Sequence, residues 1–430
     1  MVRLLNAATH RQAILDLLDN REQMEDEAAR ESVRCIVNDV RMRKDEALFE
    51  YTKQFDGVQL CAETIRIPKE EVDAIAARAD REMRASLQRA ADNIRRFHEK
   101  QLQTGFLDRE EGKALGQLIR PIESVGVYAP GGTAAYPSSV LMNVLPAKVA
   151  GVRRIALATP PNLGISPNVM AAASIAGVDT VYRMGGAQAI AALAFGTQSV
   201  RRVDKITGPG NRYVALAKRE VYGFVGIDMI AGPSEVLVVA DESADASYVA
   251  ADMLSQAEHD VLSACILITT DIDLAHRVRE EIKRQLKALK RQEIARSALE
   301  NYGLIVVAKD LHEAMELANA AAPEHLELAV KEPFLWLKHV KNAGAVFLGH
   351  YAPETLGDYY AGTNHVLPTS GTARFFSPLG VYDFIKRTSV VYYDQTRLQE
   401  ASEDIERLAL GEGLDAHAAA VAIRRKDGMR

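Results

Sequence analysis

The sequence predicts an α/β protein with two doubly wound lobes, each built around a mostly parallel sheet. A chain of 430 residues, of which 48% are hydrophobic and only 6% aromatic, can bury a large core and divide into two or three domains. From residue 124 onward, short apolar strands alternate with glycine-rich loops and helices. This alternation is typical of βαβ units, and it occurs in two separate runs, one for each lobe.

The first hundred residues are predicted to be helical. Residues 1–24 would form a short amphipathic arm, and charged helices continue over 25–101. The start lacks an unbroken apolar stretch of signal-peptide or membrane-span length. Cys35, Cys61 and Cys265 lie far apart and form no paired motif, which fits a reducing compartment. We therefore expect a cytoplasmic protein without a disulfide framework.

The charge distribution argues against a nucleic-acid partner. The formal net charge is -6, so the chain has no basic excess. The one basic run, residues 277–296, is interleaved with Glu and Leu at helical spacing, which indicates a solvated helix face.

The first run of βα units lies between residues 124 and 222. Its predicted strands are 125–128, 155–158, 178–182 and 203–206, and its helices include 138–150 and 212–222. Such units place ligands at the carboxyl edge of the sheet. No stretch reads G-x-G-x-x-G before a helix, so the standard dinucleotide fingerprint is absent. The glycine loops could still meet a nucleotide with backbone N–H groups, or they simply supply tight turns.

The second run begins near residue 232. Its predicted strands are 236–240, 265–269, 304–308 and 344–349, and its helices are 245–257, 274–289 and 311–321. A strand at 389–393 and a helical tail at 395–425 follow, and this tail is too small to fold alone. The predicted domains are the arm 1–24, a first lobe made of 25–127 with 235–378, a second lobe 128–234, and the C-terminal tail 379–430.

Gln256 and His259 could bind a metal ion. They stand three residues apart near the end of a predicted helix, which stacks both side chains on one face. Asp358 and His417, both in small-residue surroundings, could complete the site. Two imidazoles, a carboxylate and an amide oxygen suit zinc and leave room for substrate. The alternative is that His259 merely caps the C-terminus of its helix.

Glu324 and His325 could transfer protons. They follow Pro323, which ends the preceding helix and sets the first turn of the next element. At such a corner a histidine can be a base near neutral pH, and a carboxylate can orient water. The alternative is that Glu324 is a favourable charge at a helix N-terminus and His325 a surface residue.

Six motifs carry a resemblance to a known family. They are Gly-Pro-Gly-Asn at 208–211, Ala-Gly-Pro-Ser-Glu-Val at 231–236, Ser-Gln-Ala-Glu-His-Asp at 255–260, Pro-Glu-His-Leu-Glu at 323–327, Asn-His-Val-Leu-Pro-Thr at 364–369, and Glu412 with His417. In their order and spacing the chain resembles histidinol dehydrogenases, from near residue 51 to the C-terminus. One departure is Val261, where the family often has Pro; it affects loop stiffness and no ligand.

The resemblance implies a set of residue roles. One zinc ion would be bound by Gln256, His259, Asp358 and His417, with His325 as the general base and Glu324 as the group that activates water. The residues around the substrate would be Ser234, Gln256, His259, His325, Asp358, His365, Glu412 and His417. NAD would lie against Tyr128, Gln188 and Asn211. The family is a homodimer in which the C-terminal tail crosses to the other subunit, so Glu412 and His417 would serve the neighbouring site.

The implied reaction is the two-step, NAD-dependent oxidation of L-histidinol through L-histidinal to L-histidine, the last steps of histidine biosynthesis. Two alternatives remain open. A relative acting on another polar alcohol, such as a sulfonated diol, would be expected to use Arg or Lys where this chain has Glu412 and His365. A non-catalytic nucleotide-binding or assembly protein would not need the metal set together with the Glu324–His325 pair.

Overall fold

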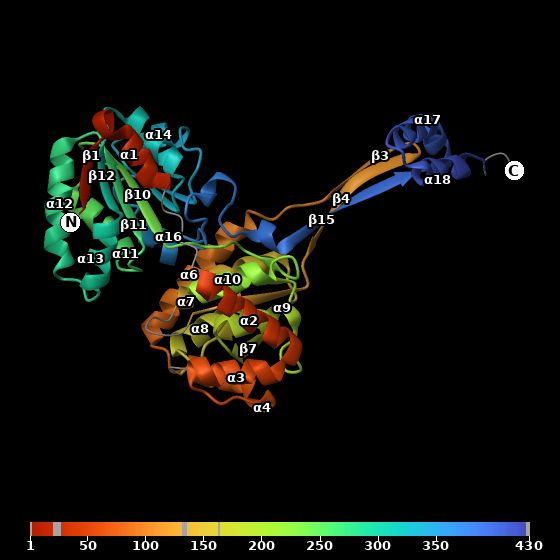
Figure 1. The fold of residues 1–430 in the computed structure, drawn as a ribbon, viewed down its shortest axis with the longest axis horizontal. Helices are drawn as coiled ribbons and strands as arrows, with labels where there is room; N and C mark the ends of the chain where they lie inside the picture. The colour runs from red at the N-terminus through yellow and green to blue at the C-terminus, as the bar shows by residue number, and fades with distance from the viewer. Residues whose placement is uncertain (1, 20–26, 131–135, 162–163, 427–430) are drawn as a thin grey trace. The chain divides into compact units, whose positions relative to one another are not determined.

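A computed structural model describes residues 2–19, 27–130, 136–161 and 164–426 of the chain. The chain divides into two compact units, Met1–Gln101 with Glu123–Asp383, and Leu102–Ile122 with Phe384–Arg430 (Figure 1). Among the described residues, the first unit holds two six-stranded sheets and the second one three-stranded sheet. The predicted α/β class with doubly wound, mostly parallel sheets is confirmed. The predicted glycine loop at Gly131–Gly132 and the last residues of the arm lie outside the described residues.

The β5 sheet, named after its central strand, has the order β2-β7-β6-β5-β8-β9. Its pairs are parallel except that β2 runs antiparallel to β7. Its strands are β2 (Arg66–Ile67), β5 (Ser124–Tyr128), β6 (Arg154–Thr159), β7 (Thr180–Arg183), β8 (Lys205–Thr207) and β9 (Gly226–Ile227). The connecting helices are α7 (Pro137–Ala150), α8 (Pro167–Ala176), α9 (Gly186–Phe195) and α10 (Arg212–Val221). Every residue of β5 is buried, as expected of a central parallel strand.

The N-terminal helices belong to this lobe. They are α2 (Glu27–Arg43), α3 (Asp45–Asp56), α4 (Ala62–Ile65), α5 (Lys69–Ala76) and α6 (Arg81–Glu99). Helices α2 and α3 pack on α9, and α5 and α6 pack on α8. The predicted grouping of 25–127 with 235–378 is therefore wrong. A helix's apolar stripe shows that the helix packs on something, but it does not identify which sheet it covers.

The β10 sheet is wholly parallel, with the order β1-β12-β11-β10-β13-β14. Its strands are β1 (Arg3–Asn6), β10 (Glu235–Ala240), β11 (Ala264–Thr269), β12 (Gly303–Val307), β13 (His325–Ala329) and β14 (Ala345–Leu348). Its helices are α1 (Ala7–Asp19), α11 (Ala246–Ala257), α12 (Ile272–Leu286), α13 (Gln292–Tyr302), α14 (Leu311–Ala321), α15 (Pro333–Leu337) and α16 (Glu354–Tyr359). The predicted helical arm thus includes an edge strand, because β1 pairs with β12.

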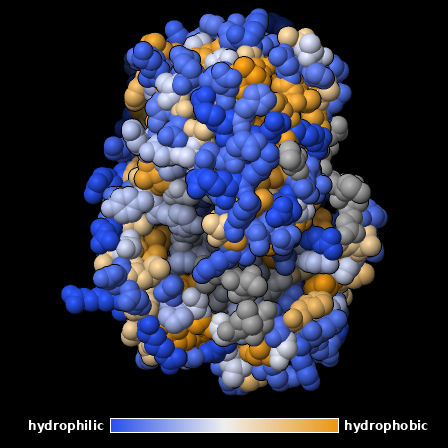
Figure 2. Space-filling model, turned by 90° about the vertical axis from the view of Figure 1, so that its left-hand side faces the viewer, coloured by the Kyte–Doolittle hydropathy of each residue, from blue (hydrophilic) through white to orange (hydrophobic). Residues whose placement is uncertain are grey.

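Both faces of the β10 sheet are covered. Val236 and Val238 of β10 belong to one apolar core, and the alternating Leu237 and Val239 belong to another. This alternation places a core on each side of the strand, as a doubly wound sheet requires. The outer surface is different: the face drawn in Figure 2 is largely hydrophilic, with hydrophobic residues in separate patches.

The second unit is an antiparallel sheet with two helices. The strand order is β15-β4-β3, from β15 (Ile385–Tyr393), β4 (Lys113–Pro121) and β3 (Phe106–Glu110), and the helices α17 (Gln395–Gly411) and α18 (Asp415–Lys426) pack on each other. The predicted tail 379–430 therefore packs on the hairpin of residues 102–122, which the predicted domains place in the first lobe. None of the helices in the described part of the chain is long and apolar enough to cross a bilayer.

Candidate active site

Most of the predicted site residues line one cavity of about 360 Å³ in the first unit. One wall consists of Pro130 just after β5, the start of α7 and the loop that follows β8. The other is formed by the starts of β10 and β13, together with residues at the ends of α11 and α16. The predicted residues in the lining are Asn211, Ser234, Gln256, His259, Glu324, His325, Asp358 and His365.

The two lobes present opposite sheet edges to this cavity. β5 and β8 are neighbours in the sheet, and both end at the cavity. The chain adds β6 and β7 on one side of β5 and then crosses to add β8 on the other side. Doubly wound sheets bind ligands at such a crevice. In the β10 lobe, by contrast, the cavity lies at the amino edge, because Val236 near the start of β10 is paired with His325, the first residue of β13.

Glu324 and His325 stand at the start of a central strand and not of a helix. Ala322, in a left-handed conformation, ends α14, and Pro323 follows it. The chain then enters β13 at His325. Glu324 is 6% exposed and His325 is 3% exposed. The alternative of a surface histidine beside a helix N-terminus is therefore wrong, since β10 and β14 flank this strand.

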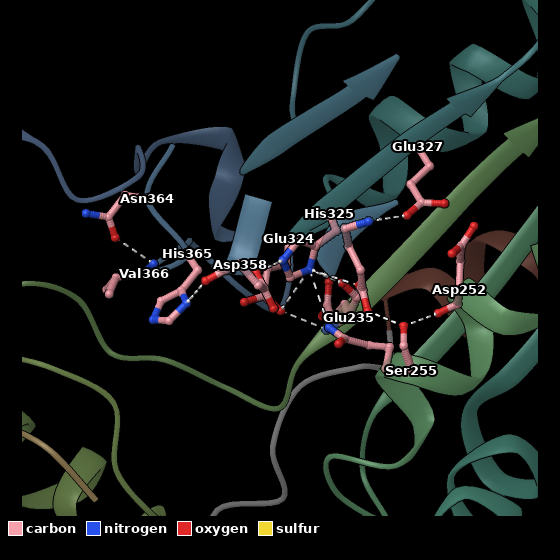
Figure 3. Close-up of polar contacts among 12 residues, drawn as sticks. Glu235, Asp252, Ser255, Glu324, His325, Glu327, Asp358, Asn364, His365 and Val366 are labelled. Carbon is pink, nitrogen blue, oxygen red and sulfur yellow. Dashed lines mark hydrogen bonds and ion pairs between the residues drawn. The ribbon is translucent and has the colours of Figure 1, made fainter. Parts of the chain in front are cut away.

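Hydrogen bonding orients the His325 ring, as Figure 3 shows. The Glu235 carbonyl lies 2.8 Å from Nδ1 and can only accept, so Nδ1 carries the proton. This leaves Nε2 of the neutral ring as the acceptor. No hydrogen-bond partner reaches Nε2 within the described residues. The unprotonated nitrogen is therefore free to accept a proton from a ligand. Glu324 is fixed on the same side, because its Oε2 accepts the Glu235 N–H at 2.8 Å.

Three carboxyl groups surround the His325 ring. Nδ1 lies 3.7 Å from Oε2 of both Glu324 and Glu354, and Nε2 lies 3.4 Å from Oδ1 of Asp358. Burial by itself lowers the pKa of His325, but the surrounding carboxylates, led by Glu324, raise it well above 6.5. Burial raises the pKa of Glu324 to about 8 and that of Glu354 to about 7. The cluster therefore exchanges protons near neutral pH, as catalytic acids and bases do.

Three of the four predicted metal ligands meet in the first unit. Gln256 lies in the last turn of α11, His259 follows that helix, and Asp358 lies in α16; all three line the cavity. Burial lowers the pKa of His259, which favours the neutral imidazole that metals bind. No three His, Cys, Asp or Glu side chains of the described chain form a metal-binding group. The fourth predicted ligand, His417, belongs to α18 of the second unit, as the C-cap Glu412 belongs to α17.

His365 uses both ring nitrogens inside the protein. Its Nδ1 donates to the Asp358 carbonyl at 3.0 Å, and its Nε2 accepts from the Ser139 hydroxyl at 3.2 Å. The neighbouring Asn364 donates to the Met142 carbonyl at 2.7 Å. The loop after α16 is thus fastened to α7, and the backbone of Asp358 is fixed with it. Direct contact of His365 with substrate stays a prediction.

The three predicted NAD residues lie in the β5 lobe. Tyr128 ends β5, and its hydroxyl accepts the Gly186 N–H at 3.2 Å. Gln188 in α9 is 1% exposed, and its Nε2 has no hydrogen-bond partner among the described residues. Asn211 caps α10, because its Oδ1 accepts two N–H groups of the first turn at 3.1 Å each. Of the three, only Asn211 lines the cavity.

Known proteins match nearly the whole chain. The family model described as histidinol dehydrogenase matches residues 19–425. A histidinol dehydrogenase of Bacillus anthracis is 55% identical over 95% of this chain and 96% of its own length. One of Heliobacterium mobile is 53% identical over 99% of each. The chain belongs to the histidinol dehydrogenase family.

The fold agrees with this membership. A crystal structure of histidinol dehydrogenase from Elizabethkingia anophelis matches 100% of this chain and 98% of its own, with a TM-score of 0.92 and 38% identity. The histidinol dehydrogenase resemblance drawn from the six motifs is confirmed.

The sequence reasoning missed several residues of this histidinol dehydrogenase cavity. Ser139 and the pair Lys218 and Asp228 line it, and Glu354 stands directly behind His325. Glu354 follows Pro353 in a loop-like stretch, which could have suggested a helix start close to Asp358. Lys218 stands beside Arg219 in a helix with a polar face, and its sequence gives no sign of burial.

Proposed function

We propose that this chain oxidises L-histidinol to L-histidine through L-histidinal, using NAD in each step, as the last steps of histidine biosynthesis. The observation that carries the proposal is that eight predicted residues from distant segments line one cavity, with the Glu324–His325 pair buried in its wall. Membership of the histidinol dehydrogenase family supports the same substrate. A cytoplasmic location stays a prediction.

His325 would act as the general base in both oxidations. In the first, Nε2 takes the hydroxyl proton of the alcohol while a hydride leaves its carbon for NAD, and the aldehyde forms. In the second, the hydrated aldehyde gives a proton to the same nitrogen and a hydride to a second NAD. The Nδ1–H bond to the Glu235 carbonyl holds the ring in the required tautomer, and the nearby carboxylates stabilise the imidazolium.

Glu324 would activate the water that adds to the aldehyde. The carboxylate accepts a proton from water while the water oxygen bonds to the aldehyde carbon. The carbonyl oxygen takes the proton that His325 gained in the first oxidation, which gives the hydrate and returns His325 to its neutral form. Its pKa of about 8 makes it a stronger base than an ordinary glutamate and still leaves part of it ionised at neutral pH. The Glu235 N–H fixes Oε2 and directs the other oxygen away from that bond.

Gln256, His259, Asp358 and His417 would hold the zinc ion. The three donors of the first unit are an amide oxygen, an imidazole and a carboxylate on one cavity wall, and they need a fourth ligand to complete a tetrahedral set. The bound ion would supply a Lewis acid that anchors the substrate's nitrogen atoms. Ser234, His365 and Glu412 would complete the substrate site together with the ligands and His325.

NAD would lie at the carboxyl edge of the β5 sheet. The switch point beside β5 is where such sheets bind nucleotides, and Tyr128 stands at the end of that strand. Gln188 lies in the first turn of the helix that follows β7, and Asn211 caps the helix that follows β8. A buried amide without a partner is costly, so the orphaned Nε2 of Gln188 favours a polar ligand beside it.

The second unit would pair with another copy of the chain. It exposes large hydrophobic side chains on strands and helices alike, among them Phe106, Val391, Leu408 and Ile423, each more than 60% exposed. Exposed apolar surface of this kind marks an interaction face. In the resulting homodimer the exchanged tail would deliver Glu412 and His417 to the neighbouring site.

Intersubunit complementation tests this exchange. The variants H325A and H417A should each be inactive. Heterodimers that contain one copy of each should regain activity, because one of their two sites then has both histidines. If His417 served its own subunit, each site would lack one histidine and the mixture would stay inactive.

The turnover assay tests the reaction itself. NADH formed per molecule of L-histidinol should approach about two, one for each hydride removed. An anionic alcohol such as a sulfonated diol should be a poor substrate. Among the described residues that line the cavity, the only Lys or Arg is Lys218, which is paired with Asp228. A yield of one NADH, or none, would contradict the proposal.

A further inference from the structure

A buried ion pair stands in the NAD-side wall of the cavity. The side chains of Lys218 and Asp228 are 4% and 1% exposed and are in direct contact. Lys218 comes from the last turn of α10, and Asp228 follows β9. Both line the cavity, and neither belongs to the proposed catalytic or metal-binding set. Moving two charges out of water costs free energy, so a buried ion pair often adds little to the stability of the fold. The presence of this pair therefore points to another role.

The pair holds one residue of the glycine loop from both sides. Lys218 Nζ donates to the Gly208 carbonyl at 3.1 Å, and Asp228 Oδ2 accepts the Gly208 N–H at 2.8 Å. Asp228 Oδ1 also accepts the Met229 N–H at 2.7 Å. The N–H and the carbonyl of Gly208 are thus both bonded to charged side chains. Hydrogen bonds with a charged partner are stronger than those between neutral groups.

Gly208 is where the loop meets the end of β5. Its φ is +115°, and a Cβ built there would lie 2.1 Å from the Tyr128 carbonyl oxygen. Only glycine permits this conformation and this approach. Three residues later Asn211 begins α10. Fixing Gly208 therefore fixes the position of Asn211 relative to Tyr128, the residue at the end of β5, and these two residues would contact NAD.

We propose that Lys218 and Asp228 are positioning residues for the cofactor. They hold the loop 208–211 against the end of β5, so that the NAD-binding surface is formed before NAD arrives. This inference rests on the proposed use of NAD. A preformed loop lowers the ordering cost of binding, so loss of the pair weakens NAD affinity and leaves the histidinol side of the cavity intact.

Three variants separate positioning from simple stability. K218M and D228N each leave one buried charge without its partner and should lower the melting temperature. The double variant K218M/D228N removes both charges, so its melting temperature should recover toward that of the wild type. Its Gly208 carbonyl still lacks the Lys218 donor. We expect its dissociation constant for NAD, measured by calorimetry, to stay about tenfold above that of the wild type. A factor of this size matches the free energy of ordering one flexible group when the ligand binds.

K205M is the matched control. Lys205 begins β8, the strand that leads into Gly208, and its Nζ donates to the Asp383 carbonyl at 2.7 Å and lies 3.3 Å from that residue's carboxylate. Neither residue lines the cavity. K205M should therefore bind NAD as the wild type does, even if it is less stable.

The outcomes are distinct. A weakened NAD affinity with an unchanged KM for histidinol, and an unchanged kcat at saturating NAD, supports positioning. Wild-type NAD affinity in K218M/D228N, or equal losses for NAD and histidinol, overturns it and leaves the pair a structural element. If the wild type itself neither binds nor reduces NAD, the proposed function fails first, and this result is visible before any variant is made.

Discussion

Replacing Glu324 by Gln should separate the two oxidations. The amide has the same shape, and its oxygen can still accept the Glu235 N–H that Glu324 Oε2 accepts at 2.8 Å. It cannot take a proton from water. Aldehyde oxidation, which needs the hydrate, should therefore slow far more than alcohol oxidation, which needs only the base His325.

The size of the effect follows from the site. A positioned general base contributes about 10²–10⁴-fold, or roughly 3–5 kcal/mol of barrier. Burial raises the pKa of Glu324 to about 8, within the range where a base is effective at neutral pH, so the upper part of that range applies. The alcohol step should lose about tenfold or less, since E324Q removes one of the carboxylates that raise the basicity of His325.

The assay follows NADH from histidinol and from histidinal given directly. E324Q should release about one NADH per site rapidly from histidinol and then stall. In the wild type, aldehyde oxidation should rise with pH up to about 8, because the carboxylate must be ionised, and E324Q should lose this rise.

E313Q is the control for E324Q, because Glu313 is equally buried but lies in α14 beside Arg11, outside the cavity. Equal slowing of both steps by E324Q would refute the assigned role.

Three further outcomes are expected. H325Q should depress both oxidations by about 10²–10⁴-fold, measured with the same two substrates, and a selective loss would contradict its role in each step. Dialysis against a chelator should abolish histidinol turnover, and added zinc should restore it in proportion to the metal bound. D252N should stabilise the fold at alkaline pH, because burial raises the pKa of Asp252 to about 6 and that of its neighbour Glu327 well above 4.5. Acids with raised folded pKa values cost stability as the pH rises through those values, so D252N should gain on the order of 1–3 kcal/mol at about pH 8 and little at about pH 4, as thermal unfolding can show.

Local sequence patterns located the elements but not their partners. The predicted strand 236–240 and helix 311–321 agree with β10 and α14 almost to the residue, since apolar runs and flanking caps are local signals. The assignment of 25–127 to the wrong lobe has a different cause. Which sheet a helix covers depends on contacts between distant segments, and no local pattern records them. The hairpin formed by β3 and β4 was missed for the same reason.

The site was predictable where motifs named its residues. Gln256, His259 and Asp358 line one cavity, from α11, the turn after it and α16, and their binding of a metal stays a prediction. The environment of these residues was not predictable. Burial beside β10 raises the pKa of Glu324 to about 8, whereas the sequence shows only an acid after a proline. Glu354, the carboxyl group behind His325, belongs to none of the quoted motifs.

The arrangement of the lobes explains why so many acids crowd one histidine. Nucleotides bind at the carboxyl edge of a sheet, and the β5 lobe offers that edge to the cavity. The β10 lobe offers its amino edge, which leaves the starts of β10 and β13 free for catalytic side chains. At those starts the Glu235 N–H binds the Glu324 carboxylate, and α16 adds Glu354 and Asp358. Buried carboxylates in such number repel one another, so a proton or a cation must be shared among them. The imidazolium that His325 forms when it takes a proton from the substrate would meet this requirement, and so would a bound zinc ion.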